Sequence, residues 1–244
     1  MERAEWLKQM QAMTEVIYDH LSPQYWVSFG LYENETHLEF LQKFLDRIPP
    51  HSSLLSAACG AGRYDGILLE AGHHVTGIDQ SAGMLERARG HFPQAHYEQM
   101  SLQKINFHEQ FEGAICIDAM EHICPEDWPG ILQGIQKALK PGGWLYLTVE
   151  VPDGEEVKAS YERSRAMGLP VLYGEIADDV EASYRRVMTL HSSDVQADIA
   201  DAPVYHFHPS LAQVRTWLEE AGLDLEEQGS GKWYEHLIVS RKKT

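Results

Sequence analysis

A glycine-rich loop and a later carboxylate are the features of this sequence most suggestive of chemistry. The stretch LLSAACGAGRYDG, residues 54–66, runs from apolar residues into that loop. Because glycine has no Cβ, Gly60 and Gly62 allow main-chain N–H groups to approach a ligand closely. Asp79 ends the next apolar run, about 20 residues further on, the spacing at which a carboxylate can accept both hydroxyl hydrogens of a ribose. Together these features predict a site for an adenosine-containing cofactor.

Two cofactors use such a site, NAD and S-adenosylmethionine (SAM). The loop G-A-G-R-Y-D-G lacks the third glycine of the dinucleotide pattern G-x-G-x-x-G. The run LKPGGWLYLT follows the fourth predicted helix directly, and the chain ends with a helix and a predicted antiparallel strand pair. These three features favour SAM. An NAD- or nucleotide-dependent oxidoreductase remains the rival enzyme.

Candidate proton-transfer residues follow the later strands. Methyl transfer to an oxygen or a protonated amine needs a base within hydrogen-bond reach of the acceptor. The candidates are His122, Glu150 and His206, with Glu121 and His208 beside them. Each histidine also fits an ordinary hydrogen-bonded loop role, so the sequence assigns no single catalytic base.

The run DAMEH could instead hold a metal ion. Asp118, Glu121 and His122 stand at positions i, i+3 and i+4, which share one face if the segment is helical. Two carboxylates and an imidazole could bind Mg²⁺, Mn²⁺ or Fe²⁺. The favoured alternative is that Asp118 faces the cofactor while Glu121 and His122 anchor the next helix, and no metal is predicted.

Alternating strands and helices must position these residues. Strands are predicted at residues 52–58, 73–79, 95–99, 113–118 and 144–150, with helical patterns between them. Leu38, Leu41 and Leu45 are expected on one face of an earlier helix, which Phe40 and Phe44 widen. This order predicts an α/β fold with a doubly wound, seven-stranded, mostly parallel sheet, closed by the antiparallel pair at residues 223–228 and 234–241. Asp79, Asp118 and Glu150 each end a strand and should therefore face one crevice.

Three local signals refine these elements. Ser81 is predicted to N-cap a helix, Gly72 to follow the end of another, and Pro129 to occupy the first position of a third.

The predicted organisation has three parts. Residues 1–50 form N-terminal helices that cover the site, and residues 51–151 and 203–244 form the cofactor-binding core. Residues 152–202 interrupt the alternation of strands and helices. They are predicted to form a mostly helical insertion that contains Tyr161, Tyr173 and Tyr184. We interpret this insertion as a lid over the acceptor; a homodimer contact or plain surface helices fit it equally well.

Charge and cysteine content restrict the partners. The 244 residues carry 20 basic and 37 acidic side chains, a formal net charge of −17, which repels nucleic acid and anionic membranes. The expected partner is a small-molecule methyl acceptor. An odd set of three cysteines, no apolar span and no apolar leader at MERAEWLKQM predict a cytoplasmic protein with reduced thiols.

Several motifs together resemble the class I SAM-dependent methyltransferases, especially the small-molecule branch that includes the ubiquinone-biosynthesis type. LLSAACGAGRY resembles their first motif, hydrophobic-(D/E)-x-G-C-G-x-G, and VTGIDQSAGMLERAR resembles the segment with the ribose-binding acid. FEGAICIDAMEHI, LKPGGWLYLT and YHFHPSLAQVRTWLEEAGL resemble their fourth strand, fifth strand and late helix. The resemblance covers about residues 38–150 and 203–241. It implies methyl transfer from SAM to an oxygen or nitrogen atom of a small molecule.

Residue by residue, the resemblance implies a set of cofactor contacts. Asp79 would bind the ribose, Gln80 and Ser101 would lie by the adenine, and Asp118 would face the methionine end. The implied set is Tyr18, Ala58, Gly60, Gly62, Asp79, Gln80, Ser101, Leu102, Ile117 and Asp118. Tyr18 resembles a tyrosine that some members close over the cofactor, although an ordinary packing role fits it equally.

Two positions depart from the family pattern. Ser56 stands where the family usually has Asp or Glu, and Ala58 stands where it usually has its first glycine. We expect Ala58 to adopt an ordinary strand-end conformation, because an alanine with positive φ would be strained. These departures keep open a third alternative, a non-catalytic SAM-binding protein.

Overall fold

The fold is built on one seven-stranded sheet. The computed structural model describes residues 1–27, 35–189 and 204–243, so residues 190–202 of the predicted insertion lie outside the described residues. The strand order is β3-β2-β1-β4-β5-β9-β8. The strands are β1 (Ser53–Ala57), β2 (His74–Asp79), β3 (His96–Gln99), β4 (Phe111–Cys116), β5 (Leu139–Glu150), β8 (Leu223–Ser230) and β9 (Tyr234–Arg241).

The pairing of these strands confirms the predicted fold class. The first five strands are parallel, while β9 runs antiparallel to both β5 and β8. The carboxyl ends of β1, β2, β3, β4 and β5 therefore lie along the same edge of the sheet, where a doubly wound fold binds its ligands.

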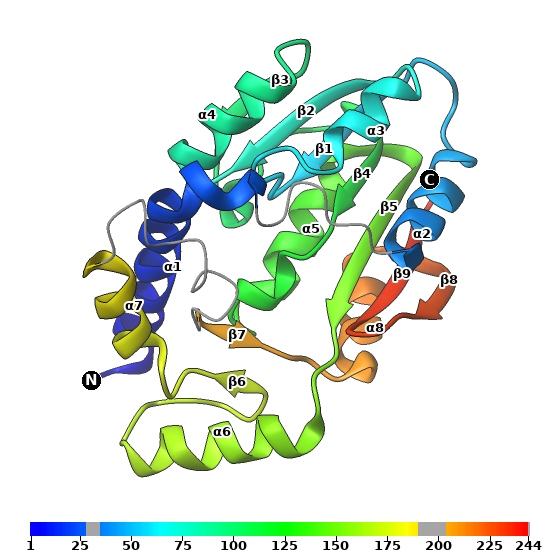
Figure 1. Cartoon of the computed structure of the whole chain (residues 1–244). Helices are drawn as coiled ribbons and strands as arrows, with labels where there is room; N and C mark the ends of the chain where they lie inside the picture. The colour runs from blue at the N-terminus through cyan, green and yellow to red at the C-terminus, as the bar shows by residue number, and fades with distance from the viewer. Residues whose placement is uncertain (28–34, 190–203, 244) are drawn as a thin grey trace.

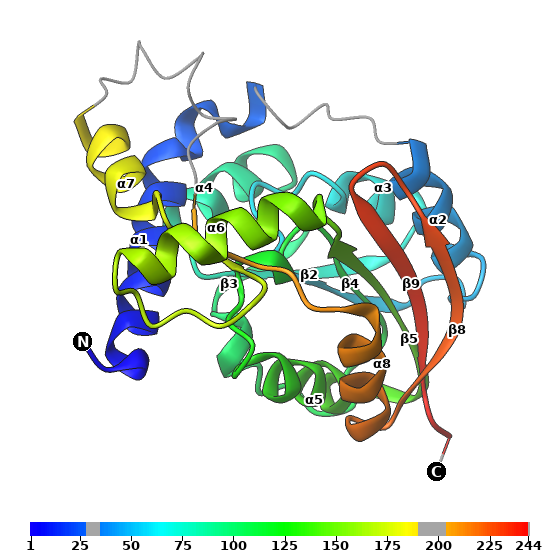
Figure 2. The same cartoon turned by 90° about the horizontal axis from the view of Figure 1, so that it is seen from below.

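Helices cover both faces of the sheet. They are α1 (Arg3–Tyr25), α2 (Glu35–Leu45), α3 (Asp65–Glu70), α4 (Ala82–His91), α5 (Trp128–Ala138), α6 (Gly154–Ala166), α7 (Val180–Thr189) and α8 (Leu211–Glu220), with the short 3-10 helices η2 (Leu102–Lys104) and η3 (Met120–His122). Figure 2 shows α5 and α8 on one side of the sheet and α3 and α4 on the other. Two buried apolar clusters correspond to these faces: Trp128 and Leu218 belong to one, and Phe44 and Leu68 to the other.

Local signals account for several helix ends. The Ser81 hydroxyl accepts a hydrogen bond from the Met84 N–H at 3.0 Å, which confirms the predicted cap. Gly72 has φ +85° just after α3, as predicted. Pro129, however, is the second residue of α5 rather than the first, because the helix begins at Trp128. Pro still fits there, since the first turn of a helix has unpaired N–H groups.

Two details of the predicted elements are wrong. The buried face of α2 consists of His37, Phe40, Leu41 and Phe44, whereas Leu38 is exposed. The buried face is therefore centred on Phe40, Leu41 and Phe44 rather than on the three leucines. In addition, β5 begins at Leu139, so the strand predicted at residues 144–150 starts five residues earlier. The pairing of β4 with β5 is irregular there, with a register shift between Phe111 and Gly113.

The described part of the insertion combines helices with a small sheet. Strand β6 (Glu175–Ile176) pairs antiparallel with β7 (His206–Phe207), which adds a strand pair to the predicted helices α6 and α7. Figure 1 shows α7 beside α1, and the two helices are in contact.

One side chain joins three parts of the chain. Arg3, at the start of α1, donates to Glu126 at 2.5 Å before α5, and to Glu175 at 2.8 Å in β6. It also donates to the carbonyl of Pro170 at 2.6 Å. The first helix, the core and the insertion therefore meet at a single guanidinium.

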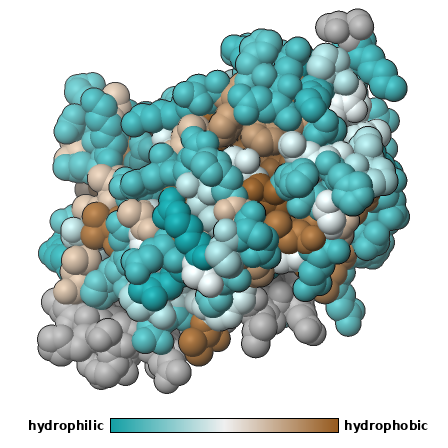
Figure 3. Space-filling view, turned by 90° about the horizontal axis from the view of Figure 1, so that it is seen from above, coloured by the Kyte–Doolittle hydropathy of each residue, from teal (hydrophilic) through white to brown (hydrophobic). Residues whose placement is uncertain are grey.

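The face of the molecule in Figure 3 is largely polar. Figure 3 shows hydrophilic residues over most of one face, with apolar residues exposed between them in small groups. Such a surface agrees with the net charge of −17. Among the described residues, no helix has the length and apolarity needed to cross a bilayer.

Candidate functional site

A cavity of about 690 Å³ opens at the carboxyl ends of the strands. Helix α1 forms one wall, and the loops after β1, β2, β3 and β4 form the other. The cavity brings together eight of the ten predicted cofactor residues: Tyr18, Ala58, Gly60, Asp79, Gln80, Ser101, Leu102 and Asp118. Gly62 and Ile117 do not line it. Whether any of these residues binds a cofactor stays a prediction.

Asp79 holds the loops of the cavity in place. One carboxylate oxygen accepts from the Gly60 N–H and the other from the Ser81 N–H, both at 2.9 Å. The Met100 N–H donates to the Asp79 carbonyl at 2.9 Å and fixes the end of β3 beside it. Burial raises the pKa of Asp79 to about 6, although both backbone hydrogen bonds oppose this rise. The carboxylate is thus oriented by the main chain without any ligand.

The predicted conformation of Ala58 is wrong. Its φ is +54°, in the left-handed region, and not an ordinary strand-end value. The Cys59 N–H donates to the Ile78 carbonyl at 2.9 Å, and the Gly60 N–H donates to Asp79, so the loop must turn sharply at Ala58. A non-glycine residue there costs roughly 1–2 kcal/mol relative to a right-handed conformation. The family glycine at this position has a physical reason, and this chain tolerates its absence.

The two loop glycines have different roles. At Gly60, which has φ +54°, an added Cβ would meet nothing within 4 Å, so the space above it is open to a ligand. At Gly62, with φ +84°, a Cβ would come within 3.0 Å of Phe92 and 3.2 Å of Asp65. Gly62 is therefore required for packing, whereas Gly60 lines the cavity.

Ser56 points away from the cavity. It is buried in β1 and hydrogen-bonds the side chain of Asp65, which also accepts from the Tyr97 hydroxyl at 2.9 Å. Burial raises the pKa of Asp65 to about 6. Ser56 thus belongs to a buried polar group between β1, α3 and β3, and it does not replace the family's acidic residue in the cavity.

Asp118 is a second acidic residue of the cavity lining, from the loop after β4. Its φ of +50° is also left-handed, and its N–H donates to the Thr148 hydroxyl at 2.8 Å. Its carboxylate lies 2.7 Å from His37 Nε2, 3.3 Å from the Arg63 guanidinium and 3.4 Å from the Tyr64 hydroxyl. Strained residues of this kind cluster at functional sites. The neighbouring Ile117 is buried in the apolar cluster of α2 and α3.

Tyr18 and His122 form a pair in the cavity wall. The Tyr18 hydroxyl lies 2.8 Å from His122 Nε2, and His122 Nδ1 lies 3.4 Å from the Tyr205 carbonyl. Because a carbonyl only accepts, Nδ1 carries the proton and Nε2 accepts from Tyr18. Burial lowers the pKa of His122 to about 4 and raises the pKa of Tyr18, so both groups are neutral at neutral pH.

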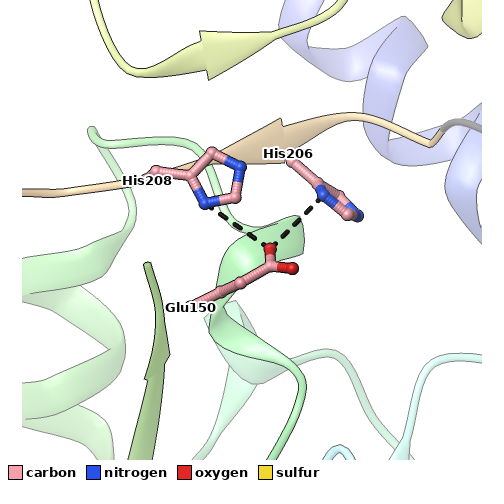
Figure 4. A group of neighbouring side chains, drawn as sticks. All are labelled: Glu150, His206 and His208. Atoms are coloured by element: carbon pink, nitrogen blue, oxygen red, sulfur yellow. Dashed lines mark ion pairs between the residues drawn. The ribbon is translucent and has the colours of Figure 1, made fainter. Parts of the chain in front are cut away.

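The other base candidates lie behind this wall. Glu150, His206 and His208 are absent from the cavity lining but adjoin one another, as Figure 4 shows. Burial raises the pKa of Glu150 to about 7, lowers that of His208 to about 4 and also lowers that of His206. Of the three predicted base candidates, only His122 reaches the cavity. Glu150 does not line the cavity that Asp79 and Asp118 share, although it lies near enough to Asp118 for that carboxylate to raise its pKa.

The DAMEH residues do not form a ligand set. Asp118 is engaged by His37 and Arg63, His122 is engaged by Tyr18, and Glu121 is buried with its pKa raised well above the usual range by burial and by the nearby Glu150. The segment forms a short 3-10 helix from Met120 rather than an α-helix from Asp118. Within the described ranges, the one group of three with donor atoms close enough for a metal is Glu150, His206 and His208.

Sequence patterns predicted N-terminal helices over the site but named only Tyr18 of α1 as a lining residue. Residues lining the cavity from this helix include Leu7, Met10, Thr14 and Tyr25. A helical pattern can predict that α1 exists, but the surface on which it packs depends on contacts with distant residues. The helix contacts α4 and α7, and no local signal predicts either contact.

Comparisons with known proteins agree with this architecture. Residues 54–143 match a methyltransferase domain family. The chain is 28% identical over 127 residues to the ubiquinone biosynthesis O-methyltransferase of Hydrogenovibrio crunogenus, covering 47% of this chain and 48% of that protein. It is 24% identical over 205 residues to the protein of the same name from Histophilus somni, covering 77% of this chain and 80% of that one. The first of these alignments thus spans about half the length of the relative.

Solved structures share the fold. One is the 1,6-didemethyltoxoflavin-N1-methyltransferase of Burkholderia thailandensis with bound 1,6-didemethyltoxoflavin and S-adenosylhomocysteine, with TM-score 0.64, 16% identity and coverage of 99% of this chain and 91% of that chain. Another is the magnesium protoporphyrin IX methyltransferase of Synechocystis with bound S-adenosylhomocysteine (SAH), with TM-score 0.62, 14% identity and coverage of 96% and 100%. The matched domain, the named relatives and the sheet topology together show that the chain is similar to the class I SAM-dependent methyltransferases.

Proposed function

We propose that this protein transfers the methyl group of SAM to an oxygen or nitrogen atom of a small molecule. The observation that carries the proposal is the single cavity lined by Gly60, Asp79, Ser101 and Asp118, which come from the ends of four neighbouring strands. Its volume of about 690 Å³ lies within the usual range of small-molecule sites, roughly 300–1,000 Å³.

The residues of the cavity suit each part of the cofactor. Asp79 would accept hydrogen bonds from the two ribose hydroxyls, because its carboxylate is already oriented by two backbone N–H groups. Gln80 and Ser101 would lie beside the adenine. The open space above Gly60 would admit the methionine part, which leads toward Asp118.

The main task of the protein in this reaction is to align the methyl acceptor with the methyl donor. When bound, SAM supplies an activated methyl group, and the protein must hold the acceptor in line with it and exclude water. Alignment of this kind can contribute ~7–11 kcal/mol to lowering the barrier. Helix α1 covers one side of the cavity and would keep water out.

An acceptor hydroxyl or ammonium must also lose a proton. His122 is the candidate base in the cavity wall, and its Nε2 is engaged by the Tyr18 hydroxyl at 2.8 Å. A proton from the acceptor would therefore pass to the Tyr18 oxygen while Tyr18 passes its own proton to His122.

The N-terminal helices and the insertion, which adjoin the cavity, suit an enzyme that acts on small molecules. We propose that the N-terminal helices and the insertion cover the acceptor, since Arg3 connects α1 to β6 beside the cavity. The net charge of −17 disfavours a nucleic-acid acceptor.

A labelled-methyl assay tests the proposal. The purified protein is incubated with radiolabelled SAM and fractionated small-molecule extracts, with Asp79→Ala as the inactive control. We expect label in a small-molecule fraction with the unaltered protein alone. Binding of SAH without transfer to any fraction would instead support a non-catalytic SAM-binding protein, and failure to bind SAH would refute the site.

A further inference from the structure

Three side chains far apart in the sequence meet behind the cavity wall. Glu150 ends β5, His206 lies in β7, and His208 follows β7 before α8. Glu150 Oε2 lies 3.5 Å from His206 Nδ1 and 3.5 Å from His208 Nδ1. The donor atoms of the three residues all lie within 4.8 Å of one another. Figure 4 shows both rings turned toward the same carboxylate oxygen.

The group is poorly satisfied by the protein itself. Glu150 Oε2 and both ring nitrogens of His208 are buried, and among the described residues none of them makes a hydrogen bond of good geometry, although the Glu150 main chain lies near enough to His208 to raise its pKa. The His208 side chain is only 5% exposed, so bulk water does not compensate for the missing bonds. Buried polar groups without partners cost about 1–3 kcal/mol each, and such a group in a native protein calls for an explanation.

A metal ion would satisfy all three side chains at once. Tetrahedral coordination with bonds of about 2.0–2.1 Å separates donor atoms by about 3.3 Å, close to the 3.5 Å between Glu150 Oε2 and each Nδ1. Two imidazoles and one carboxylate suit Zn²⁺, Fe²⁺ and Co²⁺ better than Mg²⁺ or Ca²⁺, which prefer oxygen ligands. We propose that Glu150, His206 and His208 bind one divalent transition-metal ion, with Zn²⁺ as the reference ion.

The surroundings leave room for further ligands. The side chain of His206 is 29% exposed and that of Glu150 is 23% exposed, so an ion could enter from this side and keep open positions. The His206 ring centroid lies 4.8 Å from that of His122, which lines the cavity. The proposed ion would therefore lie next to the cavity but apart from Asp79 and the nucleoside side.

Metal titration of the full chain tests this site without any methyl donor. The protein is first treated with a chelator and then titrated with Zn²⁺ by calorimetry and with Co²⁺ by visible absorption. We expect one ion per chain and a Co²⁺ spectrum of nitrogen and oxygen ligands. No stoichiometric binding of either ion would overturn the proposal.

Variants then locate the ion. Glu150→Gln and His208→Gln should each weaken Zn²⁺ binding at least about 100-fold, because loss of a direct ligand exceeds the 10–100-fold effect of losing a supporting residue. His96→Gln is the matched control, since His96 is an exposed histidine of β3 that pairs with Glu98. Thermal unfolding of the metal-free proteins shows whether the variants fold, and the two site variants provide independent tests.

The DAMEH segment is the rival location. His122→Gln should leave Zn²⁺ affinity within about twofold, because His122 is engaged by Tyr18 and Tyr205. If His122→Gln abolishes binding while His208→Gln preserves it, the ion belongs to the Asp118 segment and the proposal is wrong. Since no readout uses SAM, a failed methyl-transfer assay would not affect this result.

Discussion

The two sides of the site differ in how completely their polar groups are paired. On the nucleoside side, both oxygens of Asp79 accept backbone N–H groups at 2.9 Å. On the other side, Glu121 Oε2, Glu150 Oε2 and the His208 ring nitrogens are buried without hydrogen-bond partners among the described residues. The polar groups of Asp79 are thus paired within the protein, whereas those of Glu121, Glu150 and His208 are not.

This difference follows from where the residues come from. Asp79, Gly60 and Ser81 are fixed by adjacent strand ends of one parallel sheet, so main-chain geometry alone orients the carboxylate. Glu150 and His206 come from a core strand and from β7, which pairs with the insertion. The main chain of the sheet therefore positions the residues around Asp79. Packing between segments that are distant in the sequence positions Glu150 and His206.

The largest expected effect comes from removing the paired carboxylate. Asp79→Ala should weaken SAH binding by two orders of magnitude or more, because two charge-assisted hydrogen bonds to the ribose contribute about 1.5–3 kcal/mol each. Calorimetric titration measures the affinity. Glu98→Ala on the neighbouring strand β3 is the control, since Glu98 lies outside the cavity lining. Equal affinity of Asp79→Ala and the unaltered protein would show that the nucleoside side has been misplaced.

A second, smaller effect concerns the pair of Tyr18 and His122 in the cavity wall. Tyr18→Phe should lower the free energy of unfolding by about 1–3 kcal/mol, because it leaves the buried His122 Nε2 without its partner at 2.8 Å. Urea unfolding measures the change. Tyr173→Phe is the control, as Tyr173 is 63% exposed. Unchanged stability of Tyr18→Phe would mean that an unpaired Nε2 of His122 costs no folding free energy.

The smallest expected effect is on pH dependence. With the pKa of Asp79 raised to about 6 by burial, the carboxylate is ionised above pH 6 and protonated below it. Ribose hydroxyls donate best to the ionised form, so SAH affinity should fall as pH decreases, by about tenfold between pH 7 and pH 5. Asp79→Asn should bind weakly with a flat pH profile. A profile of the unaltered protein that is equally flat would separate Asp79 from ribose binding.

Much of the fold was predictable because its signals are local. Apolar runs, a capping serine at Ser81 and a glycine at Gly72 each mark an element within a few residues, and the family motifs specify the order of the strands. Eight of the ten residues that the sequence predicts as cofactor contacts also line one cavity.

The errors have long-range causes. Ala58 has a positive φ because hydrogen bonds to β2 turn the loop, and nothing in its own neighbourhood of the sequence requires this. Glu150, His206 and His208 were each candidates, but their meeting depends on how β7 crosses the end of β5. The orientation of α1 and the exposed side of α2 likewise depend on packing partners that are distant in the sequence.

Arg3 has a consequence for how the first helix is attached. Because one guanidinium holds Glu126, Glu175 and the Pro170 carbonyl together, it acts as a latch shared by the first helix and the inserted segment. Loss of Arg3 would therefore weaken, in a single change, the attachment of the first helix to the core and to the inserted segment.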